Sequence, residues 1–204
     1  MPFIATGKYL PNRLVFFFRQ ALQESIGLAA AERIWQAAGP QRECLPPVSD
    51  DLEKSVDFSC FSGLCSSMAG VYGEDGARSI LYRCGRTAFT KTLRSTSAIV
   101  GLDGPHFHAS AGPGMISEGL RSITRLLSLL CDMDCSVEIA PGEYRFRSAA
   151  CPECVGRIRG SGICHATAGI FRGSLDWFGV NPEIPVVETE CGLSGCAFSV
   201  STAS

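Results

Sequence analysis

The stretch Glu188-Thr189-Glu190-Cys191-Gly192-Leu193-Ser194-Gly195-Cys196 joins two apolar runs near the C-terminus and carries metal-type ligands. The flanking runs 184–188 and 196–200 predict the two strands of a hairpin. Cys164 stands at the start of a predicted helix, in Ser161-Gly162-Ile163-Cys164-His165. The thiolates of Cys164, Cys191 and Cys196, together with the carboxylate of Glu188, can satisfy a tetrahedral Zn²⁺. The C-terminal region therefore predicts a metal site.

Composition limits the classes of function that the chain can serve. Its 204 residues are 46% hydrophobic and 19% charged, which is typical of one globular domain with a sizeable core. The formal net charge of −2 leaves no basic excess to neutralise many phosphates, so we expect no direct binding of nucleic acid. No apolar run reaches the roughly 18 residues of a membrane span, and 14–18 lacks the flanks of a secretion signal. We therefore expect a cytoplasmic protein.

The cysteine content is high. Eleven cysteines are an odd number, so a complete disulfide framework would leave one unpaired. Six of the cysteines lie mostly in apolar, helix-like stretches and are predicted to be ordinary core or loop residues: Cys44, Cys60, Cys65, Cys84, Cys131 and Cys135. The five that can act chemically are Cys151, Cys154, Cys164, Cys191 and Cys196.

Hydrophobic spacing predicts a mixed secondary structure. Ser49-Asp50-Asp51 is predicted to cap a helix that reaches Tyr72, with Gly73 as its stop. The stretch 95–112, rich in Gly and Pro, is predicted to be an irregular, mobile cover over a pocket. Pro141-Gly142 predicts the turn of a hairpin. The other predicted elements are helices 12–26, 29–38, 74–93, 114–131 and 162–177, and hairpin strands 136–140 and 143–147.

Two groups of residues resemble a known family. The C-terminal group is Cys164-x-x-x-x-Gly169-Ile170-x-x-Gly173 followed by Val187-Glu188-x-x-Cys191-x-x-x-Gly195-Cys196-x-Phe198-x-Val200. The N-terminal group comprises Leu10-Pro11-Asn12-Arg13, Pro46-Pro47 and Tyr72-Gly73-x-x-Gly76-Ala77-Arg78-x-x-Leu81-x-Arg83-x-Gly85-Arg86-x-x-Phe89. Together they resemble the 4-vinyl reductase domain family, the hydrocarbon-binding domains of bacteriochlorophyll-synthesis proteins and phenol-sensing activators.

The resemblance implies a zinc site, a fold and a dimer. In the sensor members, zinc is held by residues that correspond to Cys164, Glu188, Cys191 and Cys196. Because protein atoms fill all four positions, the implied zinc is structural and ties the last helix to the last hairpin. The turn between Cys191 and Cys196 is shorter than the family's usual one, although zinc motifs with short connections are common. Relatives pair through helices, so a homodimer is expected.

A second set of thiols competes for the metal. Cys151-Pro152-Glu153-Cys154 is a CxxC that can be a redox dithiol or half of a zinc site. No thioredoxin-like strand-turn-helix pattern surrounds it. Combined with Cys191 and Cys196, the pair would complete a four-cysteine zinc site, and thiolates are the softer ligands.

Two places in the sequence offer candidate contacts for a ligand. His106-Phe107-His108 can contact a ligand beside an apolar pocket, or can be loop residues in water. Trp177 can line the same pocket, or can belong to the core. We predict no catalytic residue, because the chain shows no nucleophile elbow, P-loop or dinucleotide fingerprint.

These observations predict one α+β domain over 1–204, with helices packed on a twisted antiparallel sheet. Its helical part covers about 10–95 and its sheet and zinc part about 96–200. By resemblance, the fold is similar to the vesicle-tethering and NO-signalling ligand-binding fold. The predicted function is binding of a small hydrophobic molecule, such as an aromatic, hydrocarbon or tetrapyrrole, as carrier, chaperone or sensor. The alternatives are an enzyme or accessory subunit of tetrapyrrole vinyl reduction, and a structural module that binds a protein partner.

Overall fold

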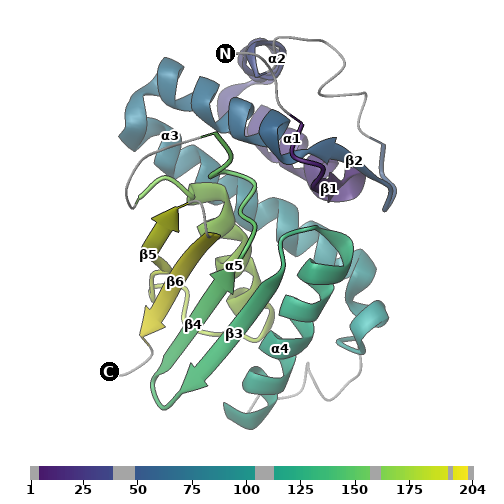
Figure 1. The fold of residues 1–204 in the computed structure, drawn as a ribbon, viewed down its shortest axis with the longest axis vertical. Coiled ribbons are helices and arrows are strands. Elements are labelled where there is room, and N and C mark those ends of the chain that lie inside the picture. Colours follow the sequence, from purple (N-terminus) through teal and green to yellow (C-terminus); the bar gives the residue numbers. More distant parts are fainter. Residues whose placement is uncertain (1–4, 39–48, 104–112, 157–161, 193–194, 202–204) are drawn as a thin grey trace.

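The computed structural model describes residues 5–38, 49–103, 113–156, 162–192 and 195–201. A helical part stacks on a part that contains a four-stranded sheet (Figure 1). The helices are α1 (Asn12–Ile26), α2 (Leu28–Ala37), α3 (Phe58–Thr96), α4 (Pro113–Leu130) and α5 (His165–Trp177), with a 3₁₀ turn at Ser97–Val100. The strands are β1 (Tyr9–Pro11), β2 (Lys54–Asp57), β3 (Cys135–Ala140), β4 (Glu143–Ser148), β5 (Val187–Gly192) and β6 (Gly195–Ser201).

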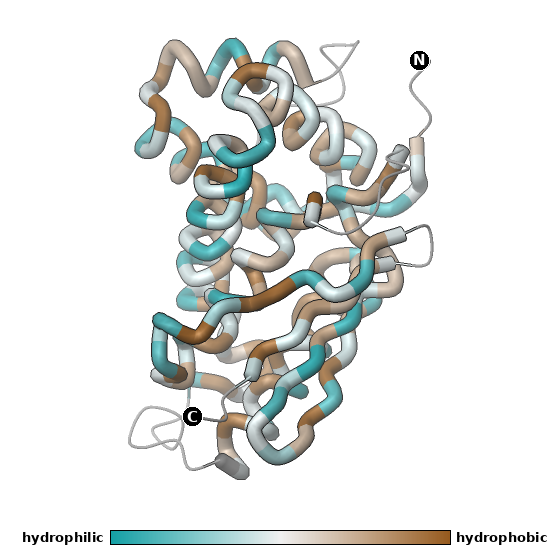
Figure 2. The backbone as a smooth tube through the Cα atoms, turned by 90° about the vertical axis from the view of Figure 1, so that its left-hand side faces the viewer, coloured by the Kyte–Doolittle hydropathy of each residue, from teal (hydrophilic) through white to brown (hydrophobic). Residues whose placement is uncertain are grey.

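The main sheet is antiparallel, in the order β3-β4-β6-β5. Hydrophilic and hydrophobic residues alternate along its neighbouring strands (Figure 2), as expected for strands with one buried face. The register places Phe146 opposite Phe198. Phe171 of α5 stacks on Phe146 with ring centroids 4.6 Å apart and contacts Phe198 at 5.1 Å. These three buried rings fasten α5 to the sheet.

Glycines allow α5 to lie directly against α3. A Cβ added to Gly85 of α3 would meet the carbonyl oxygen of Ala166 at 2.1 Å. A Cβ added to Gly169 of α5 would meet the carbonyl oxygen of Tyr82 at the same distance. Backbone therefore packs on backbone, and α5 is sandwiched between α3 and the sheet. This position holds the first turn of α5 beside the ends of β5 and β6.

The predicted start of α3 is wrong. Residues 54–57 form β2, which pairs with β1, and the helix begins at Phe58. Asp57 is the N-cap, and its carboxylate accepts a hydrogen bond from the backbone N–H of Ser59 at 2.8 Å. The predicted stop is confirmed, because Gly73 has φ 71° and interrupts the helical backbone within α3.

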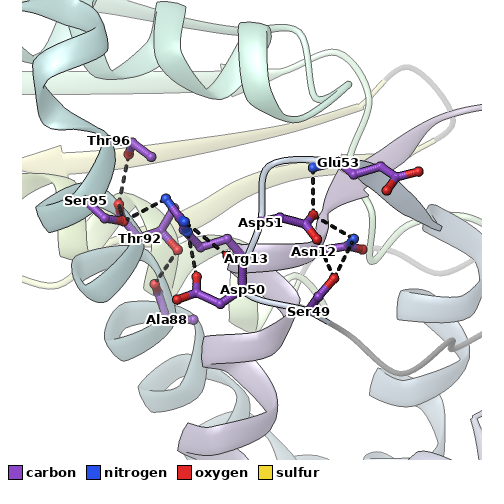
Figure 3. A network of polar contacts seen from close by, with 10 residues as sticks. All are labelled: Asn12, Arg13, Ser49, Asp50, Asp51, Glu53, Ala88, Thr92, Ser95 and Thr96. Carbon is purple, nitrogen blue, oxygen red and sulfur yellow. Dashed lines mark hydrogen bonds and ion pairs between the residues drawn. The ribbon is translucent and has the colours of Figure 1, made fainter.

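The segment Ser49-Asp50-Asp51 serves α1 instead (Figure 3). The side-chain amide of Asn12 donates to Asp51 at 2.9 Å, and Arg13 forms an ion pair with Asp50 at 2.6 Å. Arg13 also reaches the hydroxyl of Ser95, near the end of α3, at 3.4 Å. A polar segment that reads as a helix cap therefore binds the start of α1, and Arg13 links α1 to α3.

The other predicted elements are confirmed with shifts of their ends, the largest being that of the strand predicted over 184–188, which lies at Val187–Gly192. The exception is 95–103, which was expected to be irregular but continues α3 to Thr96 and adds the 3₁₀ turn. The rest of the expected cover lies outside the described residues. Within the part of the chain that the structure describes, none of the helices combines the length and apolar character needed to cross a bilayer.

Candidate metal centre

Five cysteines from four segments meet at the N-terminal end of α5. Cys151 and Cys154 belong to the loop after β4, and Cys164 is the N-cap residue of α5. Cys191 of β5 and Cys196 of β6 lie opposite one another in the sheet. The Sγ of Cys154 lies 3.1, 2.9 and 2.8 Å from those of Cys164, Cys191 and Cys196. All are buried except Cys191, which is partly exposed.

Two sets of four ligands overlap at this point. One set is Cys164, Glu188, Cys191 and Cys196, and the other replaces Glu188 and Cys191 by Cys151 and Cys154. Within each set the ligand atoms lie within 4.8 Å of one another. Tetrahedral zinc with Zn–S bonds of about 2.3 Å places its sulfurs about 3.8 Å apart. The sulfurs that are in contact would therefore have to separate by about 1 Å or less to accept an ion.

Glu188 supplies the test of whether these residues fit a cation. Its Oε2 accepts hydrogen bonds from the backbone N–H groups of Gly162 at 2.8 Å and Cys164 at 3.2 Å. Its Oε1 is buried and has no hydrogen-bond partner among the described residues. An unpaired buried carboxylate oxygen is costly, and the thiols beside it are the partners of soft divalent ions. The donor set fits Zn²⁺.

The thiols perturb one another's ionisation. Burial acts to raise the pKa of Cys151, but hydrogen bonds with Cys154, Cys164 and Cys196 hold that pKa well below its ordinary value. Hydrogen bonding with Cys151 raises the pKa of Cys164, as do the other thiols and burial. Hydrogen bonding with Cys164 lowers the pKa of Cys191 against the effect of burial. Because buried thiolates this close repel one another, full deprotonation of either set requires a cation.

Glu153 is a functional residue that the sequence interpretation missed. Its fully buried carboxylate accepts hydrogen bonds from the backbone N–H groups of Ala166 at 3.1 Å and Thr167 at 2.7 Å, in the first turn of α5. Burial raises its pKa to about 8, and the Cys151 thiol beside it acts in the same direction. The sequence signalled only that a cap was needed, because Cys is not a capping residue type, and did not identify Glu153 as its source. Cys164 makes no side-chain cap, so the helix needs a cap from elsewhere.

The predicted ligand contacts are not assembled in the described structure. His106, Phe107 and His108 lie outside the described residues. Trp177 is half-buried at the end of α5, packed against the core. Among the pockets that described residues line, a wholly apolar one lies between α1, α3 and α4 and holds about 10 Å³. An open groove of about 380 Å³ reaches Cys151 and Cys154 and gives an ion a path to the centre.

Comparison with known proteins bears on the fold. No family model and no curated protein matches the chain. A mutant H-NOX protein from K. algicida, Fe(II) and unliganded, has a TM-score of 0.63 and 12% identity over 96% of this chain and 97% of that one. A Cs H-NOX mutant with an unnatural amino acid has a TM-score of 0.60 and 13% identity over 94% of each chain. An oxygen-binding H-NOX domain related to soluble guanylate cyclases has a TM-score of 0.55 and 14% identity over 96% of each.

The chain has the H-NOX fold. This confirms the predicted class of helices packed on an antiparallel sheet, and its similarity to the NO-signalling ligand-binding fold. Identities of this size show the fold alone. The resemblance to 4-vinyl reductase domains stays a prediction.

A further structural neighbour concerns heme redox potential and porphyrin distortion. The fit of the described residues of this chain to a heme therefore has to be tested. Two interfaces in the described part of this chain leave no room for a flat macrocycle. Phe146 and Phe171 fill the space between α5 and the sheet, and the glycine contacts close the space between α3 and α5. His165 is the one histidine in the described part, and it adjoins Cys164 rather than a cavity. The described residues do not fit a heme.

Proposed function

We propose that this chain is a small-molecule-binding domain of the 4-vinyl reductase type, acting as sensor or carrier, and that one structural Zn²⁺ stabilises it. Cys164, Glu188, Cys191 and Cys196 hold the ion. The observation that carries the zinc assignment is the Glu188 carboxylate, whose buried Oε1 lacks a hydrogen-bond partner and which has an oxygen within 4.8 Å of three thiol sulfurs. With four protein ligands the ion has no open position, so its role is structural.

The zinc links elements that are distant in sequence. Cys164 stands at the start of α5, whereas the other three ligands belong to the β5–β6 hairpin. Since α5 packs on both α3 and the sheet, fixing its first turn to the hairpin holds the helical part and the sheet part of the domain in a fixed relative position. Cys151 and Cys154 remain beside the ion as thiols that can replace Glu188 and Cys191.

The proposed ligand is a small hydrophobic molecule. Support comes from the H-NOX fold, because one structural neighbour with that fold is an oxygen complex. It also comes from the resemblance to hydrocarbon-binding domains. Leu14, Leu126 and Leu130 line the apolar pocket between α1, α3 and α4. The pocket must widen to admit a ligand, because it holds about 10 Å³ and small-molecule sites usually enclose about 300 Å³ or more.

Native mass spectrometry of freshly purified protein tests this proposal. We expect one Zn²⁺ per chain, a retained apolar molecule and the mass of a homodimer. Glu188→Gln should weaken zinc retention against a competing chelator, because the charged ligand oxygen is replaced by a neutral one. The matched control is Glu190→Gln on the same strand, which should retain zinc as the wild type does. Zinc loss in Cys151→Ser with retention in Glu188→Gln would assign the ion to the four-cysteine set instead.

Ligand binding is tested separately. Phenols and small aromatic hydrocarbons are titrated into zinc-loaded protein while the fluorescence of Trp35 and Trp177 is recorded. A saturable change supports the sensor or carrier role. If no compound of the panel changes the fluorescence, that role fails, while the zinc assignment is unaffected.

One observation favours a second function. The apolar pocket that described residues line is far smaller than a usual ligand site. A purely structural module that binds a protein partner needs no such site. A purified domain that retains zinc, binds no member of the panel and recovers a specific partner would establish this alternative.

A further inference from the structure

A groove lies beside the C-terminal end of α5, and the zinc centre does not use it. It has a volume of about 670 Å³ and runs between α3 and the chain that follows α5. The α3 wall presents residues spaced three or four apart, which lie on one face of a helix. They are Arg83, Arg86, Thr87, Thr90, Lys91 and Arg94.

Cations dominate this groove. Four basic side chains line it, against the single carboxylate of Asp176. Arg83 and Arg94 are exposed, and in the described part of the chain neither has a hydrogen bond or ion pair. Lys91 pairs with the carboxylate of Glu24 at 3.4 Å and lies 5.9 Å from the centroid of the Phe17 ring. A chain with a net charge of −2 thus gathers unneutralised positive charge at one place.

The opposite wall of the groove is held in place by a buried arginine. Arg172 of α5 donates to the carbonyl oxygens of Val180 at 2.7 Å, Ile184 at 2.9 Å and Asn181 at 3.2 Å. Its guanidinium also pairs with Oδ1 of Asp176 at 2.9 Å. These bonds fix the segment that supplies Gly179, Val180 and Pro182 to the groove.

Asp176 joins this buried arginine to the groove. Its Oδ2 pairs with Arg86 at 2.5 Å, while its Oδ1 is occupied by Arg172. Both oxygens of the one lining carboxylate are therefore engaged, and Arg86 is oriented by it. Arg86 and the wall opposite α3 are therefore preorganised, and Arg83 and Arg94 keep donors that an anion can bind.

We propose that this groove binds the phosphate chain of an organic oligophosphate, such as a nucleoside triphosphate. Arginine forks match phosphate oxygens in bidentate geometry, and each phosphate offers several acceptors. The cations extend from position 83 to 94, about 16 Å at 1.5 Å per helical residue, which is longer than one phosphate needs. The volume is within the usual range of about 300–1,000 Å³ for small-molecule sites. An extended nucleic acid would need a larger basic surface.

Isothermal titration of the full chain with ATP and with inorganic triphosphate tests this inference. The groove variant is Arg83→Glu with Arg94→Glu, two exposed positions whose replacement leaves the core intact. The control is Arg121→Glu with Arg125→Glu, which makes the same charge change at exposed positions of α4. We expect saturable binding to the wild type, at least tenfold weaker binding to the groove variant, and a change of less than twofold in the control.

Each outcome is decisive. Tighter binding of ATP than of triphosphate supports the inference and shows that the nucleoside is also recognised, whereas equal binding supports recognition of the phosphates alone. Absence of saturable binding to the wild type, or equal weakening in both variants, would overturn it. Binding of a glutamate-rich decapeptide without binding of triphosphate would also overturn it, because the groove would then be a docking site for acidic protein segments.

Discussion

Removing the zinc should cost the domain a large part of its stability. The ion would cross-link Cys164 to Cys191, which are 27 residues apart in sequence. In the chain-entropy model of a cross-link, closing such a loop removes about 12 cal/mol/K from the unfolded state, or about 3.5 kcal/mol at 25 °C. The buried Oε1 of Glu188, which has no hydrogen-bond partner among the described residues, also loses the ion that would satisfy it. We therefore expect the free energy of unfolding to fall by about 3 to 4 kcal/mol.

Urea unfolding of zinc-loaded and chelator-stripped protein, followed by tryptophan fluorescence, measures this difference. Cys191→Ser should resemble the stripped protein. Cys135→Ser is the control, because Cys135 lies on β3 outside both ligand sets, and it should keep the dependence on zinc. Unfolding free energies that agree within about 0.5 kcal/mol with and without zinc would show that the ion does not hold α5 to the hairpin.

Three further predictions concern the fold. Gly85→Ala should lower the free energy of unfolding by about 1–3 kcal/mol or more, since the added Cβ meets a backbone carbonyl. Gly70→Ala on the same helix meets nothing and should raise it by about 0.5–1 kcal/mol. Thermal melts of the two variants compare them. Burial acts to raise the pKa of Asp57, but hydrogen bonds from Ser59 and Thr6 lower it overall. Its stabilisation should be complete above its unfolded pKa of about 3.9 and be lost as pH falls through the lower folded value, so the difference in urea midpoint between wild type and Asp57→Asn should shrink on acidification. Phe171→Ala should cost about 3–5 kcal/mol, and a loss under 1 kcal/mol would contradict the role of the stacked rings.

Local signals predicted most of the helices and hairpins. The apolar spacing of α4 and the Pro141-Gly142 turn act within a few residues, so they are legible without knowledge of tertiary contacts. The chemical set of cysteines was also predicted, because turn residues around Cys191 and Cys196 distinguish them from cysteines in apolar helices.

Other features depend on partners distant in sequence. The segment 54–57 forms a strand because β1 pairs with it. Without knowledge of that pairing, the polar residues 49–51 before it read as the cap of a helix. Glu153 could not be identified as the cap of α5 before the loop and the helix were placed side by side. Arg172 belongs to a residue type that is rarely buried, and only the carbonyl oxygens around it explain its position.

The choice of zinc ligands was open in the sequence and is narrowed by the fold. The five thiols form two overlapping ligand sets in the structure. The spacing of the cysteines in the sequence is compatible with both, so it could not decide whether Cys151 and Cys154 or Glu188 and Cys191 bind the ion. The unpaired carboxylate oxygen of Glu188 is a property of the assembled site.

X-ray absorption at the zinc edge of the purified protein examines the ligands themselves. The proposed site predicts one ion with three sulfur neighbours at about 2.3 Å and one oxygen at about 2.0–2.2 Å. In Glu190→Gln the same shell should persist, whereas Glu188→Gln should change it. A shell of four sulfurs that Glu188→Gln leaves unchanged, or protein that carries no zinc after metal-replete purification, would contradict the proposed centre.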